Sequence, residues 1–403
     1  MGPAGVVYCM YYPVTALSVA YFIISTLLLP LMVQAFSCLV AWIISLISSK
    51  MRNKNIITMV VSLLFLAAYF YLYSKMGDII SGLIANGTAI AVAFKKYAFP
   101  AYYFGVGIAE HNLTYLLLYT VCTLVVFELV YAILSRSFRQ ITTAKKGTAR
   151  IKYKERSMHV SSPAAALLRK DFRHFIGNPM YVLNAWMGEI LLVVACVAML
   201  IKKDILTEFL PILNGEGEIM GLILCVILCG LSCTNLITAP SISLEGKNLW
   251  IAQSIPVPAA TVLRAKVKLQ MLLCIPITAL SALLMGIVLK LELLTLVLAV
   301  LVPAAFNLFT ALLGVVVNLH FPKFDYINET VVIKQSMSTM ICMFGSMAVV
   351  LVLALLYALL LSASVAPTLF LAVCLVLLVI VCVLMWRYLG HGGSARFAAL
   401  QAD

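Results

Sequence analysis

Two glutamates, Glu128 and Glu189, stand inside long apolar stretches of this 403-residue chain. An ionised side chain in the hydrocarbon of a bilayer costs several kcal/mol, so a carboxylate there is either functional or neutralised. The functional interpretation is a proton or cation path. The alternative is a protonated or amide-paired glutamate near a helix end. The sequence favours this alternative, since Glu189 lies about two helical turns from the polar start of its segment at Tyr181.

Three cysteines, Cys225, Cys229 and Cys233, are spaced four residues apart, and Gly221 continues the row. In a helix this spacing places all four on one face. A row of small residues predicts a seam at which a second helix approaches closely. A metal site is the alternative, but no histidine or carboxylate joins the row. Only Cys9 of the eleven cysteines lies outside the apolar runs, so we expect no exterior disulfide framework.

The sequence carries no Gly-x-x-x-x-Gly-Lys-Ser/Thr motif, and the stretches "KKGTAR" and "EGKNLW" lack its spacing. The five histidines lie outside the apolar runs without metal-ligand spacing, and no Ser/His/Asp arrangement is evident. We therefore expect no enzyme activity, no metal and no cofactor in this chain. Energy for any work must come from elsewhere.

Hydrophobic residues make up 64% of the chain and charged residues only 11%, a balance that ordinary soluble proteins do not show. Because a helix needs roughly 20 apolar residues to cross the hydrocarbon, the many such runs predict an all-α, polytopic membrane protein. We expect about nine transmembrane helices, near residues 16–47, 56–74, 115–135, 181–201, 219–238, 268–289, 293–318, 337–361 and 367–386.

Lysine and arginine gather in alternate loops, as the positive-inside rule requires of cytoplasmic segments. With residues 48–55, 136–180, 239–267 and 319–336 and the C-terminal tail inside, about 22 of the 28 basic residues are cytoplasmic. The net charge of +13 then follows from topology and from contact with anionic lipid headgroups. We expect the lipid bilayer as a partner, and no nucleic acid.

Two prolines, Pro30 and Pro303, interrupt apolar runs in similar settings. Each is followed four residues later by an amide, Gln34 or Asn307, and further on by a basic loop and two more apolar runs. A proline frees a backbone carbonyl inside a helix, which a nearby amide or a packed neighbour satisfies. We interpret the pattern as an internal duplication, common among transporters, and the prolines as candidate flexing points.

The duplication predicts a partial first unit, residues 1–135, with only its last three helices, and a complete second unit of six helices, residues 181–386. A basic cytoplasmic linker, residues 136–180, joins them, with an amphipathic helix in "SPAAALLRKDFRHFIGNP" along the inner surface. Residues 387–403 form a cytoplasmic tail. A natural form that begins before Met1 and adds three helices is a further hypothesis.

A polar stretch, residues 243–258 with the sequence "SLEGKNLWIAQSIPVP", separates two apolar runs. Glu245 marks a plausible helix start. Leu244, Ile251 and Ile255 then recur at helical spacing before two prolines end the run. The pattern predicts a short helix with one apolar edge, a shape that suits docking into a groove on a partner.

The stretch "SISLEGKNLWIAQSIPVPAATVLRAKVKLQMLL" resembles the cytoplasmic loop of permease subunits of bacterial ABC-2 type exporters, which carry a Ser, Glu-Gly-Lys, Trp and Ser-x-Pro pattern. Upstream, "LLRKDFRHFIGNPMYVLN" resembles the start of the second half of these subunits, and "FPKFDYINETVVIKQS" resembles the loop four helices on. Three such stretches in order, at compatible spacing, are fairly specific to the family, but they do not indicate a substrate.

The resemblance implies that the first loop is a coupling element, which sits on a separate ATPase subunit and transmits its closing motion. The alternative is that these residues fold a compact turn at the headgroups, with Trp250 at the interface. The positions that match the coupling motif are Glu245, Gly246, Lys247, Trp250, Ser254 and Pro256. Those that match the second loop are Phe321, Pro322, Lys323, Asp325, Asn328, Glu329, Lys334 and Gln335.

Taken together, the resemblance implies an ABC-2 type permease in a bacterial cytoplasmic membrane, with its C-terminus inside. ATP then binds to the partner, a separate ATPase subunit in two copies, and the permease forms a dimer or pairs with a second permease. The rival prediction is an ion-coupled secondary transporter that uses Glu128 and Glu189. A substrate is not indicated by either.

Overall fold

The computed structural model of the protein is almost entirely helical over the residues it describes. The described residues also include connecting segments and one isolated antiparallel bridge between Trp186 and Asn235. The predicted class, an all-α polytopic membrane protein, is confirmed. Cys9 and residues 144–160 of the predicted basic linker lie outside the described part. The described residues are 16–49, 54–86, 99–109, 112–143, 161–201 and 217–401, with the single positions 10, 92, 95 and 96.

Among the described residues, six helices are long and apolar enough to cross a membrane. A seventh span results if α3 (Lys54–Ser74) and α4 (Met76–Ala85), which meet at a bend of 50°, are taken together. The remaining two predicted spans correspond to shorter apolar helices, α10 (Met187–Ile201) and α12 (Gly217–Ser232). Helices thus occupy all nine predicted segments. The six long spans are α2 (Ala16–Ser49), α7 (Leu113–Thr143), α14 (Ala259–Val288), α15 (Leu293–His320), α18 (Pro367–Gly390), and α16 (Glu329–Gln335) continued by α17 (Met337–Leu356) and η2 (Tyr357–Leu361).

Contacts between residues divide the chain into two compact units, Met1–Arg156 and Ser157–Asp403. In the N-terminal unit α2 packs against α7, and α6 (Phe99–Ala109) packs against both. Pro30 lies inside α2 without ending it. Gln34, four residues on, is exposed, and its Nε2 donates to Cys38 Sγ at 3.4 Å. The structure therefore gives Gln34 a different partner from the freed carbonyl that the sequence suggested.

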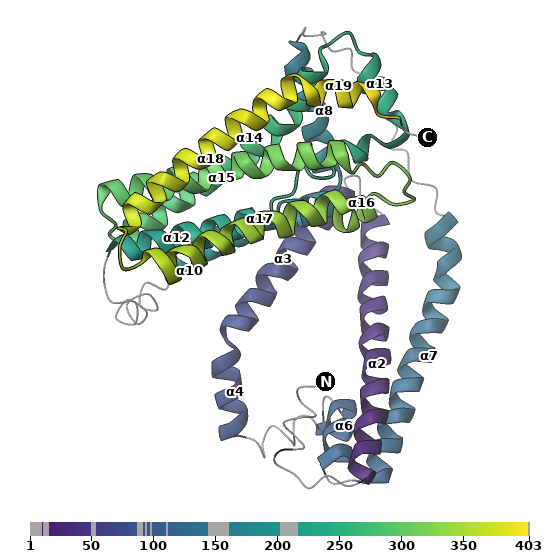
Figure 1. Ribbon diagram of the computed structural model, residues 1–403. Coiled ribbons are helices and arrows are strands. Elements are labelled where there is room, and N and C mark those ends of the chain that lie inside the picture. The colour runs from purple at the N-terminus through teal and green to yellow at the C-terminus, as the bar shows by residue number, and fades with distance from the viewer. Residues whose placement is uncertain are drawn as a thin grey trace. The chain divides into compact units, whose positions relative to one another are not determined.

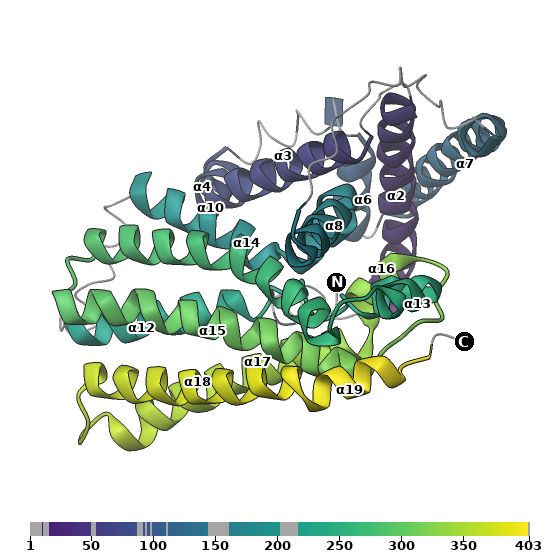
Figure 2. The ribbon, with the colours of Figure 1, turned by 90° about the horizontal axis from the view of Figure 1, so that it is seen from above.

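Helix α15 is the centre of the C-terminal unit. It packs against α12, α14, α17 and α18, and Figures 1 and 2 show α14, α15 and α18 running side by side. A helix that is apolar on all sides is stable where neighbours cover it, and buried side chains recur in α15 from Thr295 to Leu319. Pro303 does not end α15, and Asn307 Nδ2 donates to the carbonyl oxygen of Pro303 at 3.2 Å. The predicted amide contact is present, although the carbonyl is that of the proline itself.

The cysteine row lies in the core between α12 and its neighbours. Cys225, Cys229 and Cys233 are buried, and a Cβ added at Gly221 would collide with the Thr295 side chain on α15. This close approach is what a seam of small residues allows. The described ranges hold no group of three or more His, Cys, Asp or Glu side chains placed to bind a metal.

Two predicted spans are interrupted where they meet. Helix α9 (Pro179–Ala185) ends at Ala185, and Trp186 separates it from α10. Helix α12 ends at Ser232 rather than at residue 238. The two breaks pair with each other, because Trp186 and Asn235 form the isolated bridge and Leu236 N donates to Ala185 O at 2.8 Å. The stretch "SCTNLITAPS" that follows α12 is rich in residues whose side chains compete with helical hydrogen bonds. The predicted continuous spans at 181–201 and 219–238 are therefore corrected.

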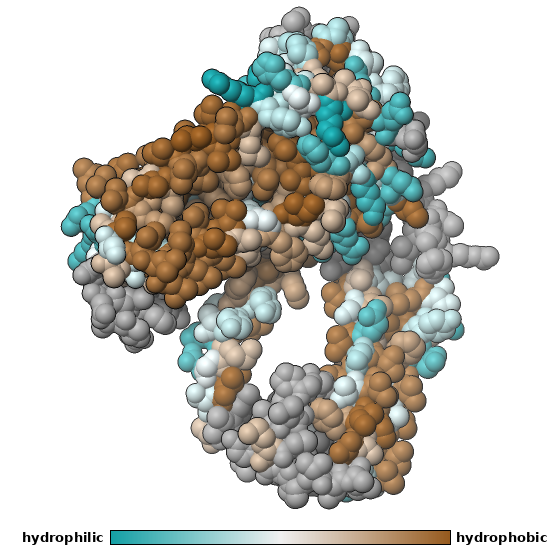
Figure 3. Space-filling view, in the orientation of Figure 1, coloured by the Kyte–Doolittle hydropathy of each residue, from teal (hydrophilic) through white to brown (hydrophobic). Residues whose placement is uncertain are grey.

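One end of the C-terminal unit is polar. Helix α8 (Pro163–Gly177), α13 (Leu249–Ser254), α16 and α19 (Gly392–Ala399) lie there. Figure 3 shows hydrophilic residues over this end and hydrophobic residues along the long helices of the unit. We call it the polar end.

Helix α8 is part of the C-terminal unit. Ser162 Oγ caps it by accepting from Ala165 N at 3.3 Å, and Pro163 follows at the first helical position. The amphipathic pattern then buries Leu167 and Phe175, and α8 packs on α14 and α9. The sequence assigned this helix to a linker, whereas its buried face ties it to the C-terminal unit.

Candidate functional site

The first polar loop, residues 243–258, forms two short helical turns rather than one helix. A 3₁₀ segment, η1 (Ser243–Asn248), leads into α13. Gly246 forms a kink inside η1, with φ +52° and ψ −137°. Residues that carry a Cβ rarely adopt this backbone conformation. A Cβ at Gly246 would also lie 2.9 Å from the Tyr326 hydroxyl oxygen. A glycine is therefore required at this turn.

The break redistributes the apolar edge that the sequence predicted. Leu244 is buried, whereas Ile251 and Ile255 are exposed. The apolar residues that face the core after the turn are Leu249 and Ala252. The prediction of a single helix with Leu244, Ile251 and Ile255 on one edge is therefore wrong, because the turn at Gly246 rotates the two segments relative to each other.

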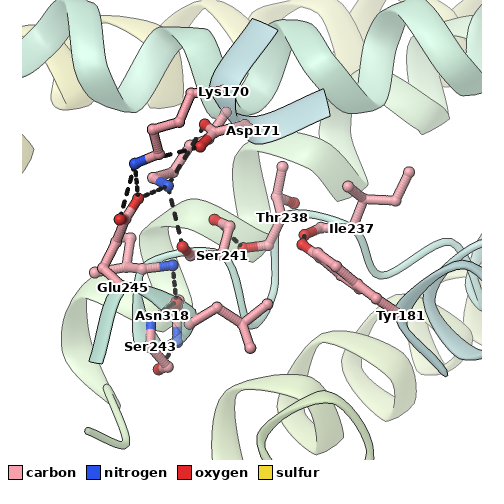
Figure 4. Close-up of polar contacts among 12 residues, drawn as sticks. Lys170, Asp171, Tyr181, Ile237, Thr238, Ser241, Ser243, Glu245 and Asn318 are labelled. Atoms are coloured by element: carbon pink, nitrogen blue, oxygen red, sulfur yellow. Dashed lines mark hydrogen bonds and ion pairs between the residues drawn. The ribbon is translucent and has the colours of Figure 1, made fainter. Parts of the chain in front are cut away.

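Four charged side chains from three elements meet beneath this loop (Figure 4). Lys266 Nζ on α14 lies 2.7 Å from Glu245 Oε1 and 3.5 Å from Asp171 Oδ2, and it donates to Ser241 O at 3.0 Å. Lys170 Nζ on α8 lies 2.7 Å and 2.8 Å from the two carboxylate oxygens of Glu245. We call Lys170, Asp171, Glu245 and Lys266 the ion-pair cluster.

The ion-pair cluster neutralises charges that are largely removed from water. The Lys266 side chain is only 3% exposed and that of Glu245 13%, so each charge requires a close partner. Burial on its own would raise the pKa of Glu245, but the Lys266 and Lys170 ammonium groups outweigh it and lower the pKa to about 2. Glu245 is therefore ionised at neutral pH, and it holds the loop to α8 and α14.

Asn318, near the end of α15, ties the same loop to two long helices. Its Oδ1 accepts from Ile242 N at 2.8 Å and from Ser243 N at 3.1 Å. Its Nδ2 donates to Ser243 Oγ at 2.7 Å and to Ser338 Oγ on α17 at 3.0 Å. Because Asn318 is fully buried, all four contacts are made away from solvent, and they connect the loop to α15 and α17.

The second polar loop, residues 321–336, packs directly on the first. Lys323 N donates to Ser243 Oγ at 2.9 Å, and the Tyr326 hydroxyl donates to Leu244 O at 3.2 Å. Asn328 caps α16 by accepting from Thr330 N at 3.0 Å. Glu329, the next residue, accepts from Asn178 Nδ2 at 2.5 Å. The structure thus brings together the two loops that the sequence singled out separately.

The C-terminal helix α19 supports the far side of the first loop. Gln253 Nε2 donates to Phe397 O at 2.8 Å and to Leu400 O at 2.9 Å. Arg396 Nε in turn donates to Leu319 O at the end of α15, at 3.0 Å. The residues predicted as a cytoplasmic tail therefore include a helix that contacts the first loop.

The residues of the predicted coupling motif have two different environments. Glu245 and Gly246 face inward, to the ion-pair cluster and Tyr326. The others are exposed, Trp250 by 64%, and apolar Ile251 and Ile255 are exposed beside it. We call this surface the exposed knob; it consists of Lys247, Trp250, Ile251, Ser254, Ile255 and Pro256.

The predicted residues of the second loop divide in the same way. Glu329 is partly buried against Asn178, and Pro322 is partly buried. The remaining ones lie at the surface of the polar end. These exposed residues are Phe321, Lys323, Asp325, Asn328, Lys334 and Gln335.

The four intramembrane polar residues named from the sequence fall into separate places. Glu189 and Asn307 are buried in the C-terminal unit and share Thr278 as a hydrogen-bond partner. Glu128 is exposed on α7, and Gln34 is exposed on α2. The structure therefore joins Glu189 to Asn307 but supplies no comparable setting for Glu128.

Sequence reasoning missed several residues that build the site. Lys170 and Lys266 counted only as basic residues of cytoplasmic loops, and Asp171, Asn318 and Tyr326 were not singled out. One usable signal was the acid–base pair at 170 and 171 in a helix with an apolar face. The other was the isolated amide at the end of the apolar run "GVVVNLHF".

The model of a family described as "Putative ATP-binding cassette" matches residues 79–385, more than half of the 403 residues. The chain belongs to this family. The match runs from α4 into α18 and includes both polar loops. No curated protein and no solved structure matches the chain. The protein is thus a helical membrane protein linked to ATP-binding-cassette transport, which is the part of the sequence resemblance that the match confirms.

Proposed function

We propose that this chain is the permease subunit of an ABC-2 type exporter. It moves an unidentified substrate across the bacterial cytoplasmic membrane, and a separate ATPase subunit, in two copies, binds and hydrolyses the ATP. The chain works as a dimer or with a second permease, with the polar end and the C-terminus in the cytoplasm. The observation that carries the proposal is the exposed knob, held on an internally braced loop.

A coupling element has to be exposed to its partner and rigidly connected to the helices that it moves. The exposed knob presents Trp250, Ile251 and Ile255 on one small surface. Buried or partly buried polar contacts beneath it reach four elements: α8 and α14 through Asp171, Lys266 and Glu245, α15 through Asn318, and α19 through Gln253. A loop that served only to anchor the chain at lipid headgroups would not need these connections.

The family and the sequence supply the second argument. The family is described by its ATP-binding cassette, yet the printed sequence has no phosphate-binding Gly-x-x-x-x-Gly-Lys-Ser/Thr motif. The two statements are compatible if the cassette belongs to another polypeptide and this chain supplies the membrane helices. The positive-inside distribution of basic residues favours the same orientation, with the polar end facing the ATPase.

The test is nucleotide hydrolysis by the complex purified through this chain. We expect ATPase activity to copurify with the wild type, and to fall at least tenfold in the double variant Trp250→Ala, Ile251→Ala, because both side chains belong to the knob. Leu293→Ala is the matched control, since Leu293 is exposed and apolar but begins α15 at the opposite end. The proposal fails if the knob variant retains the same hydrolysis as the control, or if the chain alone moves cargo.

A further inference from the structure

Glu189 lies in the first turn of α10, next to the break at Trp186. The residue is only 1% exposed. Its Oε1 accepts from Thr278 Oγ1 at 2.8 Å and from Asn235 Nδ2 at 2.9 Å, and its backbone N donates to Asn235 Oδ1 at 3.1 Å. The carboxyl group is therefore held in one orientation from two sides.

Further neutral polar groups surround this contact. Asn307 Nδ2 donates to Thr278 Oγ1 at 2.9 Å and to Ser232 Oγ at 3.0 Å. Asn235 Nδ2 also lies 3.4 Å from Asn307 Oδ1. We call Glu189, Ser232, Asn235, Thr278 and Asn307 the intramembrane polar cluster. It gathers residues from α10, α12, α14 and α15 and from the irregular segment after α12.

The second carboxyl oxygen, Glu189 Oε2, is buried and has no hydrogen-bond partner. No lysine, arginine or histidine in the described part of the chain forms an ion pair with Glu189. Three elements, α9, α12 and α14, pack on α10. Of the titratable groups on these elements, the Cys274 thiol on α14 interacts with Glu189. Others have different partners: the Tyr181 hydroxyl on α9 donates to Ile237 O, Lys266 belongs to the ion-pair cluster, Arg264 lies over the Trp386 ring, and Glu218 accepts from Thr368 at the far end of α12. An ionised carboxylate here would carry a charge that no neighbour balances.

A proton fits this site better than a metal ion does. A Cβ added at Gly188, the neighbour of Glu189, would collide with the Leu231 carbonyl oxygen and lie 2.6 Å from Asn235 Oδ1. The backbone is thus closely packed beside Asn235, and the described ranges gather no three His, Cys, Asp or Glu side chains that could hold a metal ion. Binding a proton needs no such room, because it adds one O–H bond to an oxygen that is already in place.

The intramembrane polar cluster is connected to the polar end along one face of α14. Lys266, Gln270, Cys274 and Thr278 are spaced four residues apart, and all four are buried. Gln270 Nε2 donates to Asn235 O at 3.0 Å, and its Oε1 accepts from Thr238 N at 3.0 Å. Lys266 belongs to the ion-pair cluster, and Asn235 contacts Glu189. The two clusters are thus about 18 Å apart along the helix axis, with Gln270 between them.

We propose that Glu189 is a proton-binding site inside the membrane, and that Gln270 couples its protonation to the loop at the polar end. The proton comes from solvent and adds to the carboxylate as an O–H bond, and it leaves by the reverse step. This role goes beyond the proposed permease function, because it makes the conformational equilibrium of the helices depend on pH. Cargo movement would then respond to proton concentration as well as to ATP.

Infrared spectroscopy of the full chain in lipid nanodiscs tests the site without any ATPase, so its outcome is independent of the permease proposal. We expect a carboxylic acid C=O band that disappears in Glu189→Gln and diminishes as the pH is raised. The control Glu292→Gln makes the same chemical change at an exposed residue and leaves the band intact. Thr278→Val removes one hydrogen bond to Glu189 Oε1, so it should move the band without abolishing it.

The coupling is tested by Gln270→Met, which keeps the side-chain length but removes the contacts to Asn235 and Thr238. We expect the pH at which the Glu189 band is half-maximal to move in this variant and to stay in place in Glu292→Gln. The site is refuted if Glu189→Gln removes no band, or if its band persists at every pH at which the chain stays folded. An unmoved midpoint in Gln270→Met refutes the coupling.

Discussion

Replacing Glu245 by glutamine removes the central charge of the ion-pair cluster while keeping the size of the side chain. In the folded protein the pKa of Glu245 is lowered from 4.5 to about 2, and its side chain is largely shielded from solvent. This difference corresponds to roughly 3 kcal/mol of stability at neutral pH. Lys266, which is only 3% exposed, would keep Asp171 at 3.5 Å as its remaining carboxylate partner.

Thermal unfolding of the purified chain measures the effect. A loss of about 3 kcal/mol lowers the melting temperature of a unit of this size by roughly 6–12 °C. The pH dependence has a defined sign. Because the folded pKa of Glu245 lies below its unfolded value, the contribution is fully present above about pH 4.5 and disappears as the pH falls towards 2. Glu245→Gln should therefore flatten the stability profile between these two values.

A double-mutant cycle separates this account from a general loss of packing. Lys266→Met removes the buried ammonium group, so Glu245→Gln combined with Lys266→Met leaves no unpaired charge at position 266. We expect the stability loss of the double variant to be smaller, by at least about 1 kcal/mol, than the sum of the stability losses of the two single variants. If the stability loss of the double variant equals that sum to within about 0.5 kcal/mol, the two residues do not stabilise each other and the reasoning is refuted.

Three further predictions concern the same loop. Gly246→Ala should destabilise the protein by about 1–2 kcal/mol in chemical denaturation, because φ is +52° and Tyr326 is close, while Gly345→Ala, with nothing within 4 Å of its Cβ, should not. Asn318→Ala should lower the free energy of unfolding by about 2–4 kcal/mol, because it leaves the N–H groups of residues 242 and 243 buried without an acceptor. Amide hydrogen exchange at these two residues should become faster, and unchanged exchange would contradict the anchoring role. Trp250→Ala should leave the melting temperature within about 2 °C of the wild type, because the side chain is exposed and makes few internal contacts; a larger drop would mean that Trp250 supports the fold.

The helical membrane fold follows from hydropathy alone, because long apolar runs leave no other structure that satisfies the backbone in lipid. Boundaries were less predictable. Helix α14 begins at Ala259 rather than near residue 268, since Arg264, Lys266 and Lys268 read as loop charges in sequence. Lys266 is tolerated in the helix because two carboxylates from distant segments surround it. Only the folded arrangement reveals such partners.

The loop at 243–258 shows the same limit at the site. The positions of this loop and of the loop at 321–336 could be predicted from local sequence, but their contact with each other and the role of Glu245 could not. In sequence it reads as an exposed docking charge, whereas in the structure it holds the loop from beneath. The difference arises from Gly246, whose left-handed conformation turns the chain between Glu245 and Trp250. Periodicity rules assume a continuous helix and cannot register that turn.

The internal duplication stays a prediction. In the N-terminal unit α2 packs against α7, and in the C-terminal unit α15 packs against α18, so the proline-bearing helix contacts the second span after it in both. The amides differ, because Asn307 is buried in the intramembrane polar cluster and Gln34 is exposed. Among the described residues, the intramembrane polar cluster around Asn307 therefore has no counterpart around Gln34.

The central claim is that the exposed knob contacts a separate ATPase, and crosslinking from its centre tests this most directly. A photoreactive amino acid placed at Trp250 in the full-length chain, in cells, should yield an adduct with a nucleotide-hydrolysing subunit. The same substitution at Leu293 should not yield this adduct. The account is contradicted if the probe at position 250 reacts only with lipid, whether the probe at 293 captures the ATPase or neither probe does. The knob would then be an interfacial anchor.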